Sequence, residues 1–222
     1  MSKYHIGIMT GTSADSIDGC IVSFENDFSL IASDSIDHEN GYKDNYEDCI
    51  AQGLKEVHQS KKLEKLENDL NEKSLELIEN LLSKNNLSYE DVIAIGFSGQ
   101  TVFHTREKSY QIGNPQIIAN NSKIKVISDF RNFDIAKGGS GAPLIPAFHK
   151  YLFSESRKEK IIFNIGGISN GTFLKGNEIS LASDVGPGNC LIDKIAKKEL
   201  GLSFDNGGDS ARKGELHQAL LD

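Results

Sequence analysis

One segment near the N-terminus combines glycine, hydroxyl-bearing and acidic residues in a pattern that can bind phosphate. Its residues are Gly11, Thr12, Ser13, Ala14, Asp15, Ser16, Ile17 and Asp18. Backbone N–H groups of a glycine-bearing turn can form a concave nest for phosphate oxygens, and the two hydroxyls add donors. Asp15 and Asp18 offer the hard oxygen ligands that Mg²⁺ takes. The lysine of a Walker A loop is absent, and this segment taken alone favours a plain hairpin turn with self-capping side chains.

Two later segments also carry glycines next to polar side chains. In residues 164–170, an apolar strand runs into Gly166 and Gly167, which permit close approach of a ligand, although such a pair is more often only a hairpin. In residues 183–189, Asp184 lies at the end of a strand and a helix begins at Asn189. A carboxylate held there can serve as a general base, and the helix N-terminus favours anions. An Asx-type turn with Asn189 as N-cap is an equally good interpretation.

A fourth group of polar residues lies in loops between apolar strands and suits recognition of a hydroxylated ligand such as a sugar. The arginine of this group can form a two-pronged contact with a carboxylate. Isolated histidines are more often structural, and no catalytic triad or metal-ligand spacing is present. The group comprises Gln100, His104, Gln111, Asn114, Asp129, Arg131, Asp134, Gly138, Gly139 and His149.

Hydrophobic periodicity predicts the elements that position these residues. The strands expected are 4–9 and 19–24 as a hairpin, 92–97, 125–128, and a meander of 160–164, 171–174 and 178–182. The helices expected are 44–58, 60–85, 143–153, 189–200 and 210–221, the second with leucines three, four or seven residues apart. Residues 128–142 are expected to form a glycine-rich loop and residues 154–160 a linker. Two strand–glycine turn–strand units give the chain a loose internal symmetry.

Composition narrows the class of protein. The chain has 222 residues, with 24 basic and 32 acidic side chains and a net charge of −8. That balance argues against a general nucleic-acid binder, which needs a basic surface. No segment approaches the roughly 20 apolar residues of a membrane span, and the N-terminus lacks the apolar stretch of a signal peptide. Three widely spaced cysteines suit a reducing compartment. We therefore expect a cytoplasmic globular protein that binds neither nucleic acid nor a membrane.

Six segments, taken together and in order, resemble one family. They are MTGTSADSID (9–18), GQTVFH (99–104), QIGNP (111–115), SDFRNFDIAKGGSGAPLIPAFH (128–149), NIGGISN (164–170) and DVGPGN (184–189). The chain is similar to the anhydro-N-acetylmuramic acid kinases, which belong to the actin-like ATPase and sugar kinase superfamily. Each segment has a plain structural explanation by itself, but their ordered combination does not.

The resemblance implies an α/β protein with the actin-like (RNase H-like) two-lobe sugar kinase fold. The lobes expected are residues 1–153 and 154–222, the second incomplete. ATP and Mg²⁺ are implied, with residues 11–18 and Gly166 and Gly167 as phosphate loops and Asp18 at the metal. The substrate is an amino sugar, 1,6-anhydro-N-acetylmuramic acid, whose opening and phosphorylation yield the 6-phosphate in cell-wall murein recycling. By similarity Asp184 is the base that activates water, and the sugar contacts are Gln100, Asn114, Arg131, Asp134 and Asn189. A homodimer is implied by the family alone.

The chain departs from the family pattern in three places and in length. Thr10 replaces a serine, Ser16 replaces a glycine, and Ser98 replaces a histidine near the expected sugar site. Family members continue beyond the position that matches Asp222, and that part carries an adenosine-binding motif. The alternative to an active kinase is therefore an inactive remnant, or the N-terminal half of a split kinase that binds sugar or phosphate and needs a separate C-terminal half. A related kinase with another sugar preference is a weaker alternative.

Overall fold

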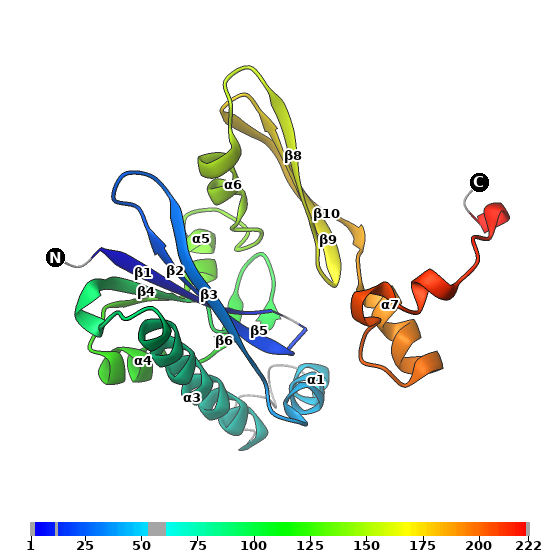
Figure 1. Cartoon of the computed structure of the whole chain (residues 1–222). Helices are drawn as coiled ribbons and strands as arrows, with labels where there is room; N and C mark the ends of the chain where they lie inside the picture. The colour runs from blue at the N-terminus through cyan, green and yellow to red at the C-terminus, as the bar shows by residue number, and fades with distance from the viewer. Residues whose placement is uncertain (1–2, 12, 53–60, 221–222) are drawn as a thin grey trace. The chain divides into compact units, whose positions relative to one another are not determined.

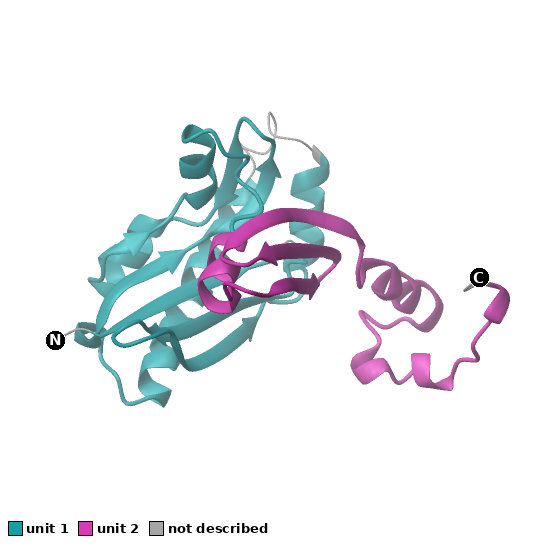
Figure 2. Ribbon diagram, turned by 90° about the horizontal axis from the view of Figure 1, so that it is seen from above, with its two compact units in different colours: residues 1–144 teal, residues 145–222 magenta. Residues whose placement is uncertain are grey.

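The computed structural model describes residues 3–11, 13–52 and 61–220, and the chain divides into two compact units (Figures 1 and 2). The first unit is residues 1–144 and the second is residues 145–222. The sequence led us to expect the division after residue 153, at the end of helix α6 (Pro146–Phe153), whereas the second unit begins just before this helix. Each unit is described by itself. Both combine strands with helices, and the α/β class expected from the sequence is confirmed.

The first unit is built on a five-stranded mixed sheet in the order β3-β2-β1-β4-β7. Strands β1 (Tyr4–Thr10), β2 (Ser16–Ser23) and β3 (Ser29–Asp37) form an antiparallel meander. Strands β4 (Val92–Phe97) and β7 (Val126–Ile127) extend it in parallel on the other side of β1. Strand β3 was missed because its burial alternates only weakly along an outer edge.

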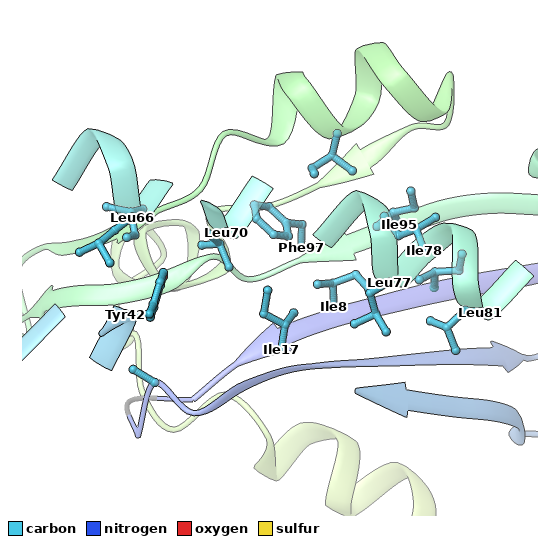
Figure 3. Close-up of a cluster of buried hydrophobic side chains, with 14 of the residues drawn as sticks. Ile8, Ile17, Tyr42, Leu66, Leu70, Leu77, Ile78, Leu81, Ile95 and Phe97 are labelled. Carbon is cyan, nitrogen blue, oxygen red and sulfur yellow. The ribbon is translucent and has the colours of Figure 1, made fainter. Parts of the chain in front are cut away.

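Helix α3 (Lys61–Lys84) covers one face of this sheet and makes the core (Figure 3). The expected leucine stripe of this helix is buried, and Leu70 and Leu77 are fully so. Figure 3 shows these leucines packed against side chains from β1, β2 and β4, among them Ile8, Ile17 and Phe97. The 3.6-residue period therefore predicted both the helix and its buried face.

Shorter elements connect the sheet to the loops of the expected site. Helix α1 is Tyr42–Gln52 and begins before the expected helix 44–58, of which residues 53–58 lie outside the described residues. Strands β5 (Gln100–His104) and β6 (Ser109–Ile112) form a separate two-stranded sheet, and helix α4 is Pro115–Ser122. A short 3₁₀ turn, η1, spans Tyr89–Asp91. The expectation of one continuous loop over residues 128–142 is wrong, because α5 (Phe130–Ala136) forms within it.

The second unit begins with α6 and continues into a three-stranded antiparallel sheet in the order β10-β9-β8. The strands are β8 (Glu159–Ile165), β9 (Ile168–Lys175) and β10 (Glu178–Pro187). This meander repeats the order of β1 to β3, in line with the internal symmetry of the sequence. Helix α6 packs on β9 and β10, where His149 Nδ1 lies 2.9 Å from Thr172 Oγ1.

The chain after β10 has little regular structure beyond two short helices. Helix α7 (Cys190–Ile195) runs into a π-helical turn, η2 (Ala196–Leu200). Three 3₁₀ turns follow at η3 (Asn206–Gly208), η4 (Ala211–Lys213) and η5 (Gln218–Leu220). The expected helix over 210–221 is therefore wrong within the described residues. None of the helices in the described part of the chain combines the length and the apolar character that a membrane crossing needs.

Candidate phosphate loops and sugar pocket

The first glycine loop connects β1 to β2 and turns its carbonyl groups toward the protein. Its backbone is closed by the Ala14 amide, which donates to the Gly11 carbonyl at 3.2 Å. Among hydrogen bonds between described residues, none uses the amides of Gly11, Ser13 or Asp15 as a donor. Thr12 lies outside the described residues. Three unengaged amides beside two exposed aspartates are what a phosphate-binding turn with a nearby cation requires.

The backbone of this loop differs from what its glycine-to-serine substitution suggested. A serine in place of the family's glycine would strain the turn if position 16 needed a positive φ, but Ser16 begins strand β2 and has no positive φ. The left-handed residue is Ala14, with φ of 52° and a side chain that is only 1% exposed. Thr10, the other substituted position, keeps a useful hydroxyl that donates to the Ser16 carbonyl at 3.0 Å. The hydroxyl–acceptor geometry is therefore present with threonine in place of serine.

Gln100 was expected to contact the sugar, and the structure places it beneath the first glycine loop. Its side chain is fully buried, and its Nε2 donates to the Gly11 carbonyl at 3.0 Å. Gly99 precedes it with φ of 62°, and a Cβ there would lie 2.5 Å from the Ile112 carbonyl oxygen. Glycine is thus required where β4 turns into β5. The turn brings Gln100 to the loop instead of to open solvent.

Arg131 and Asp134, both expected to contact sugar, hold the glycine-rich segment that follows α5. Arg131 Nη1 donates to the Gly141 carbonyl at 3.0 Å, and Asp134 Oδ2 accepts from the Gly141 amide at 2.8 Å. Burial lowers the pKa of Arg131, which nevertheless stays protonated, because arginine does not lose its proton in proteins. Burial and the Arg131 charge lower the pKa of His104. The guanidinium retains further N–H donors for a ligand, so the expected sugar contact stays a prediction.

A cavity of about 250 Å³ opens in the first unit between β4, β6 and the start of α5. This volume suits part of a sugar. Ser109, Tyr110 and Asn132 line it and were not singled out in the sequence. Asn132 Oδ1 accepts from the Ser109 amide at 2.9 Å, and Asn132 Nδ2 donates to the Ser109 carbonyl at 3.0 Å. Three of the family segments contribute part of its lining, namely Gly99, Gln111, Gly113, Pro115, Ser128, Asp129 and Asn132. The rest of the lining is Phe97, Ser98, Ser109 and Tyr110, which lie outside those segments.

Helix α3 fixes the cavity wall that contains the QIGNP segment. The Gly113 amide donates to Glu67 Oε1 at 3.0 Å, and the Asn114 amide donates to Asn71 Oδ1 at 2.8 Å. Glu67 and Asn71 are one helical turn apart and therefore face the same way. Asn114, an expected sugar contact, caps α4 through its side-chain oxygen, which accepts from the Gln116 amide at 2.9 Å. The anchoring role of Glu67 was missed because its charge resembled that of an ordinary solvated helix face.

In the second unit, the two glycine-bearing segments meet at the end of the meander. The Gly188 amide donates to the Gly167 carbonyl at 2.9 Å, and the Asn189 amide donates to the Gly166 carbonyl at 2.8 Å. Asn189 Nδ2 also donates to the Ile165 carbonyl at 3.2 Å. Among the described residues, the amides of Gly166 and Gly167 donate to no acceptor. The glycine pair thus presents unengaged N–H groups, as in the first loop.

Asp184 lies next to this junction, on an exposed stretch of β10. It pairs with Asn170 of β9, which pairs with Asn164 of β8, so the three polar residues form one row across the sheet. The register shifts between Asp184 and Gly186, which marks a bulge. Bulges re-aim side chains and are frequent beside functional sites. A carboxylate here is accessible to water, as a general base must be.

The donor set of the first loop fits a magnesium nucleotide. Mg²⁺ is usually held by one or two carboxylates together with phosphate oxygens and waters. Asp15 and Asp18 are both exposed and close in sequence, and Asp18 lies on β2 opposite Met9. Within the described ranges, no three histidine, cysteine or acidic side chains cluster into an all-protein metal site. Asp18 can therefore hold a cation in company with phosphate oxygens.

Comparison with known proteins identifies the family. The sequence matches the family model described as anhydro-N-acetylmuramic acid kinase over residues 3–222. The chain belongs to the anhydro-N-acetylmuramic acid kinase family. A relative of that name from Shewanella sp. (strain W3-18-1) is 40% identical over 226 residues, which cover 99% of this chain and 60% of the relative. The Haemophilus influenzae relative is 37% identical, over 99% of this chain and 58% of its own length.

The chain spans about 60% of the length of the curated anhydro-N-acetylmuramic acid kinases it matches. Among solved structures, a ROK family glucokinase from Streptomyces griseus in complex with glucose and AMPPNP has 12% identity and a TM-score of 0.38, covering 83% of this chain and 48% of its own. An Aquifex aeolicus Ppx/GppA phosphatase has 12% identity and a TM-score of 0.43, with 87% and 55% covered. The assignment to the family rests on the sequence matches.

Proposed function

We propose that this chain takes part in the ATP-dependent conversion of 1,6-anhydro-N-acetylmuramic acid to N-acetylmuramic acid 6-phosphate, a step of cell-wall murein recycling in the cytoplasm. The observation that carries the proposal is that each unit holds a glycine turn with amides that donate to no described residue, located in segments shared with the family. A glycine turn of this kind suits the binding of nucleotide phosphates.

In the proposed reaction, every bond that forms is matched by a bond that breaks, and the proton released by water has an acceptor. Asp184 accepts a proton from water as the water oxygen bonds to the anomeric carbon and the bond from that carbon to O6 breaks. The freed O6 bonds to the terminal phosphorus of ATP, and ADP leaves. Catalysis of phosphoryl transfer is mostly positioning and charge neutralisation, to which the amides of Gly11 and Ser13 are proposed to contribute. Gly166 and Gly167 are proposed phosphate contacts of the second unit. Bound Mg²⁺, held with the help of Asp18, would neutralise phosphate charge.

The sugar is proposed to lie against the first unit. The cavity that Ser98 lines also carries hydroxyl and amide side chains from Ser109, Gln111 and Asn132, the kind of partners that sugar hydroxyls use. Asn114, Arg131 and Asp134 remain proposed sugar contacts on this unit. Asn189, which belongs to the second unit, remains a proposed contact from the family resemblance alone. Ser98 is shorter than the histidine common in the family, which leaves more room at that wall.

A second candidate has one observation in its favour: the second unit exposes an apolar sheet face. Phe163, Phe173 and Val185 surround Gly171 on this face, and their exposed fractions are 50%, 38% and 62%. Exposed apolar patches of this kind mark surfaces that another part or partner covers. We therefore propose that turnover needs the remaining part of the family sequence, on the same or a separate polypeptide. Without it, the chain is proposed to bind phosphate or sugar without turnover. A homodimer remains a proposal from the family alone.

Mass spectrometry of the product tests both candidates. Folded chain is incubated with Mg-ATP and 1,6-anhydro-N-acetylmuramic acid, alone and with the remaining family sequence supplied by fusion or co-expression. We expect N-acetylmuramic acid 6-phosphate from the completed protein and none from the chain alone. Product from the chain alone would refute the need for the remainder. No product from either folded preparation would refute the kinase proposal.

A further inference from the structure

Three carbonyl groups of the first glycine loop are held by groups from three separate segments. The Gly11 carbonyl accepts from Gln100 Nε2 on β5 at 3.0 Å. The Asp15 carbonyl accepts from the His38 amide, just after β3, at 2.9 Å. The Ser16 carbonyl accepts from Thr10 Oγ1, at the end of β1, at 3.0 Å. With these three carbonyls engaged, the amides of Gly11, Ser13 and Asp15 remain without an acceptor among the described residues.

Gln100 is itself held by a buried tyrosine. The Tyr42 hydroxyl donates to Gln100 Oε1 at 2.9 Å, and Tyr42 is only 4% exposed. Both ends of the Gln100 amide are thus occupied, and the orientation of the amide is fixed: its oxygen accepts from Tyr42 and its nitrogen donates to Gly11. A hydrogen-bonded chain runs from helix α1 through β5 to the loop. Such a buried chain is costly to interrupt, because each lost partner leaves a polar group unpaired.

His38 closes the arrangement from the other side. Its ring stacks on the Tyr42 ring at 3.7 Å between centroids and 5° between planes. Its Nε2 lies 3.4 Å from Thr10 Oγ1. Because the Thr10 proton is directed to the Ser16 carbonyl, the contact is satisfied by a neutral ring that carries its proton on Nε2. Burial lowers the pKa of His38 to about 4, so the ring is neutral near pH 7.

We propose that Gln100 and Tyr42, supported by His38, are positioning residues that hold the first glycine loop with its amides free for the nucleotide phosphates. The inference deepens the proposed function and rests on it for the identity of the ligand. It reassigns Gln100 from the sugar to the loop. Loss of the Gln100–Tyr42 hydrogen bonds should weaken nucleotide binding and leave sugar binding largely intact. If Gln100 contacted the sugar instead, its loss would weaken sugar binding and leave nucleotide binding largely intact.

Three variants of the full chain test the assignment. Tyr42→Phe removes the hydroxyl and retains the ring that stacks on His38. Gln100→Met retains the length of the side chain and removes both polar ends. The double variant tests whether the two side chains act together. Once Gln100 is replaced, the Tyr42 hydroxyl no longer has the Gln100 acceptor, so removing that hydroxyl as well should have little further effect. Tyr89→Phe is the matched control, since its hydroxyl lies 3.5 Å from Glu79 on a half-exposed surface away from the loop.

The measurements are amide chemical shifts and hydrogen exchange of Gly11, Ser13 and Asp15 by NMR, and the dissociation constants of Mg-ATP and of the anhydro sugar. We expect Tyr42→Phe and Gln100→Met to shift the loop amides, to speed their exchange, and to weaken Mg-ATP roughly tenfold. The double variant should be little worse than Gln100→Met. Tyr89→Phe should match the wild type.

Loop amides that are unchanged in Gln100→Met and Tyr42→Phe would overturn the inference, as would loss of sugar binding with Mg-ATP binding intact. Failure of the wild-type chain to bind Mg-ATP is a separate result that counts against the proposed function. In that case the NMR comparison still decides whether these two residues position the loop.

Discussion

Adding one methyl group at Gly188 should break the junction that joins the two glycine segments of the second unit. A Cβ there would approach the Gly166 carbonyl oxygen closer than 3.0 Å and would lie 2.9 Å from Ser169 Oγ, distances that real Cβ atoms essentially never show. One obstacle is backbone, which cannot rotate away as a flexible side chain can. The junction must therefore open in Gly188→Ala.

The expected loss of stability in Gly188→Ala follows from the steric overlap and from the hydrogen bonds that it weakens. Overpacking against fixed atoms costs about 1–3 kcal/mol. Opening the junction also weakens the Gly188–Gly167 and Asn189–Gly166 hydrogen bonds of 2.9 and 2.8 Å, each worth about 0.5–1.5 kcal/mol. Since the two contributions overlap, we expect the second unit to lose about 2–4 kcal/mol. Gly186→Ala is the matched control, because nothing lies within 4 Å of its added Cβ. It should change stability by no more than about 0.5 kcal/mol, since the reduced freedom of the unfolded chain offsets small costs.

Hydrogen exchange measured by mass spectrometry on peptides covering residues 164–190 reports on this junction directly, and urea unfolding followed by circular dichroism gives the free energy. A chain of two compact units need not unfold in a single two-state transition, so the local measurement decides. Faster exchange at residues 188–190 in Gly188→Ala, with Gly186→Ala like the wild type, is the expected pattern. Equal behaviour of the two variants would refute the reasoning.

Three further predictions concern the first unit. Leu77→Ala, at a fully buried position of α3, should lower the free energy of unfolding by about 2–5 kcal/mol in urea titrations. Glu72→Ala, at an exposed position of the same helix, should change that free energy by no more than about 0.5 kcal/mol. Similar losses in the two variants would contradict the assigned core. Asn71→Leu leaves the Asn114 amide without its partner. It should lower the free energy of unfolding by about 1–3 kcal/mol and speed hydrogen exchange of that amide. Unchanged exchange would show that α3 does not anchor the QIGNP segment. Because the folded-state pKa of His38 is lowered from 6.5 to about 4, the unfolded state binds more protons between these values, and stability falls as the pH is lowered through this window. Allowing for partial exposure, the loss from pH 7 to pH 5 should be about 1 kcal/mol and should shrink in His38→Gln; the same pH slope in both proteins would exclude His38 as its source.

The sequence predicted the elements whose burial is periodic. Helix α3 and its leucine face, the β1–β2 hairpin, β4 and the β8–β10 meander were all expected, because one face of each repeats apolar residues at the helical or strand period. Strands β5 and β6 and helix α4 escaped prediction, because their formation depends on anchors from elsewhere. The amides of Gly113 and Asn114, for example, are held by Glu67 and Asn71 of α3.

Polar side chains were harder to assign than elements. Gln100 looked like a sugar ligand by its type and its loop position, yet its partners, Tyr42 and Gly11, are 58 and 89 residues away. No local pattern reveals such partners. The end of the chain illustrates the opposite error. Residues 210–221 have a helical pattern, but the Asp205 carboxylate accepts from the amides of Ser210 and Ala211, and Leu216 is 77% exposed. Without a surface to bury its apolar side, the segment gains no tertiary stabilisation as a helix.

The most direct test of the proposed kinase is a coupled ATP-turnover assay with 1,6-anhydro-N-acetylmuramic acid, in which wild type and Asp184→Asn are compared in protein completed with the remaining family sequence. Glu215→Gln, which alters an exposed carboxylate of the same unit, is the control. We predict sugar-dependent turnover that Glu215→Gln retains and that Asp184→Asn loses by at least about a hundredfold, the scale of general-base catalysis. Turnover that persists in Asp184→Asn would contradict the role of this carboxylate as the base. Absence of turnover in the folded wild type would contradict the kinase itself.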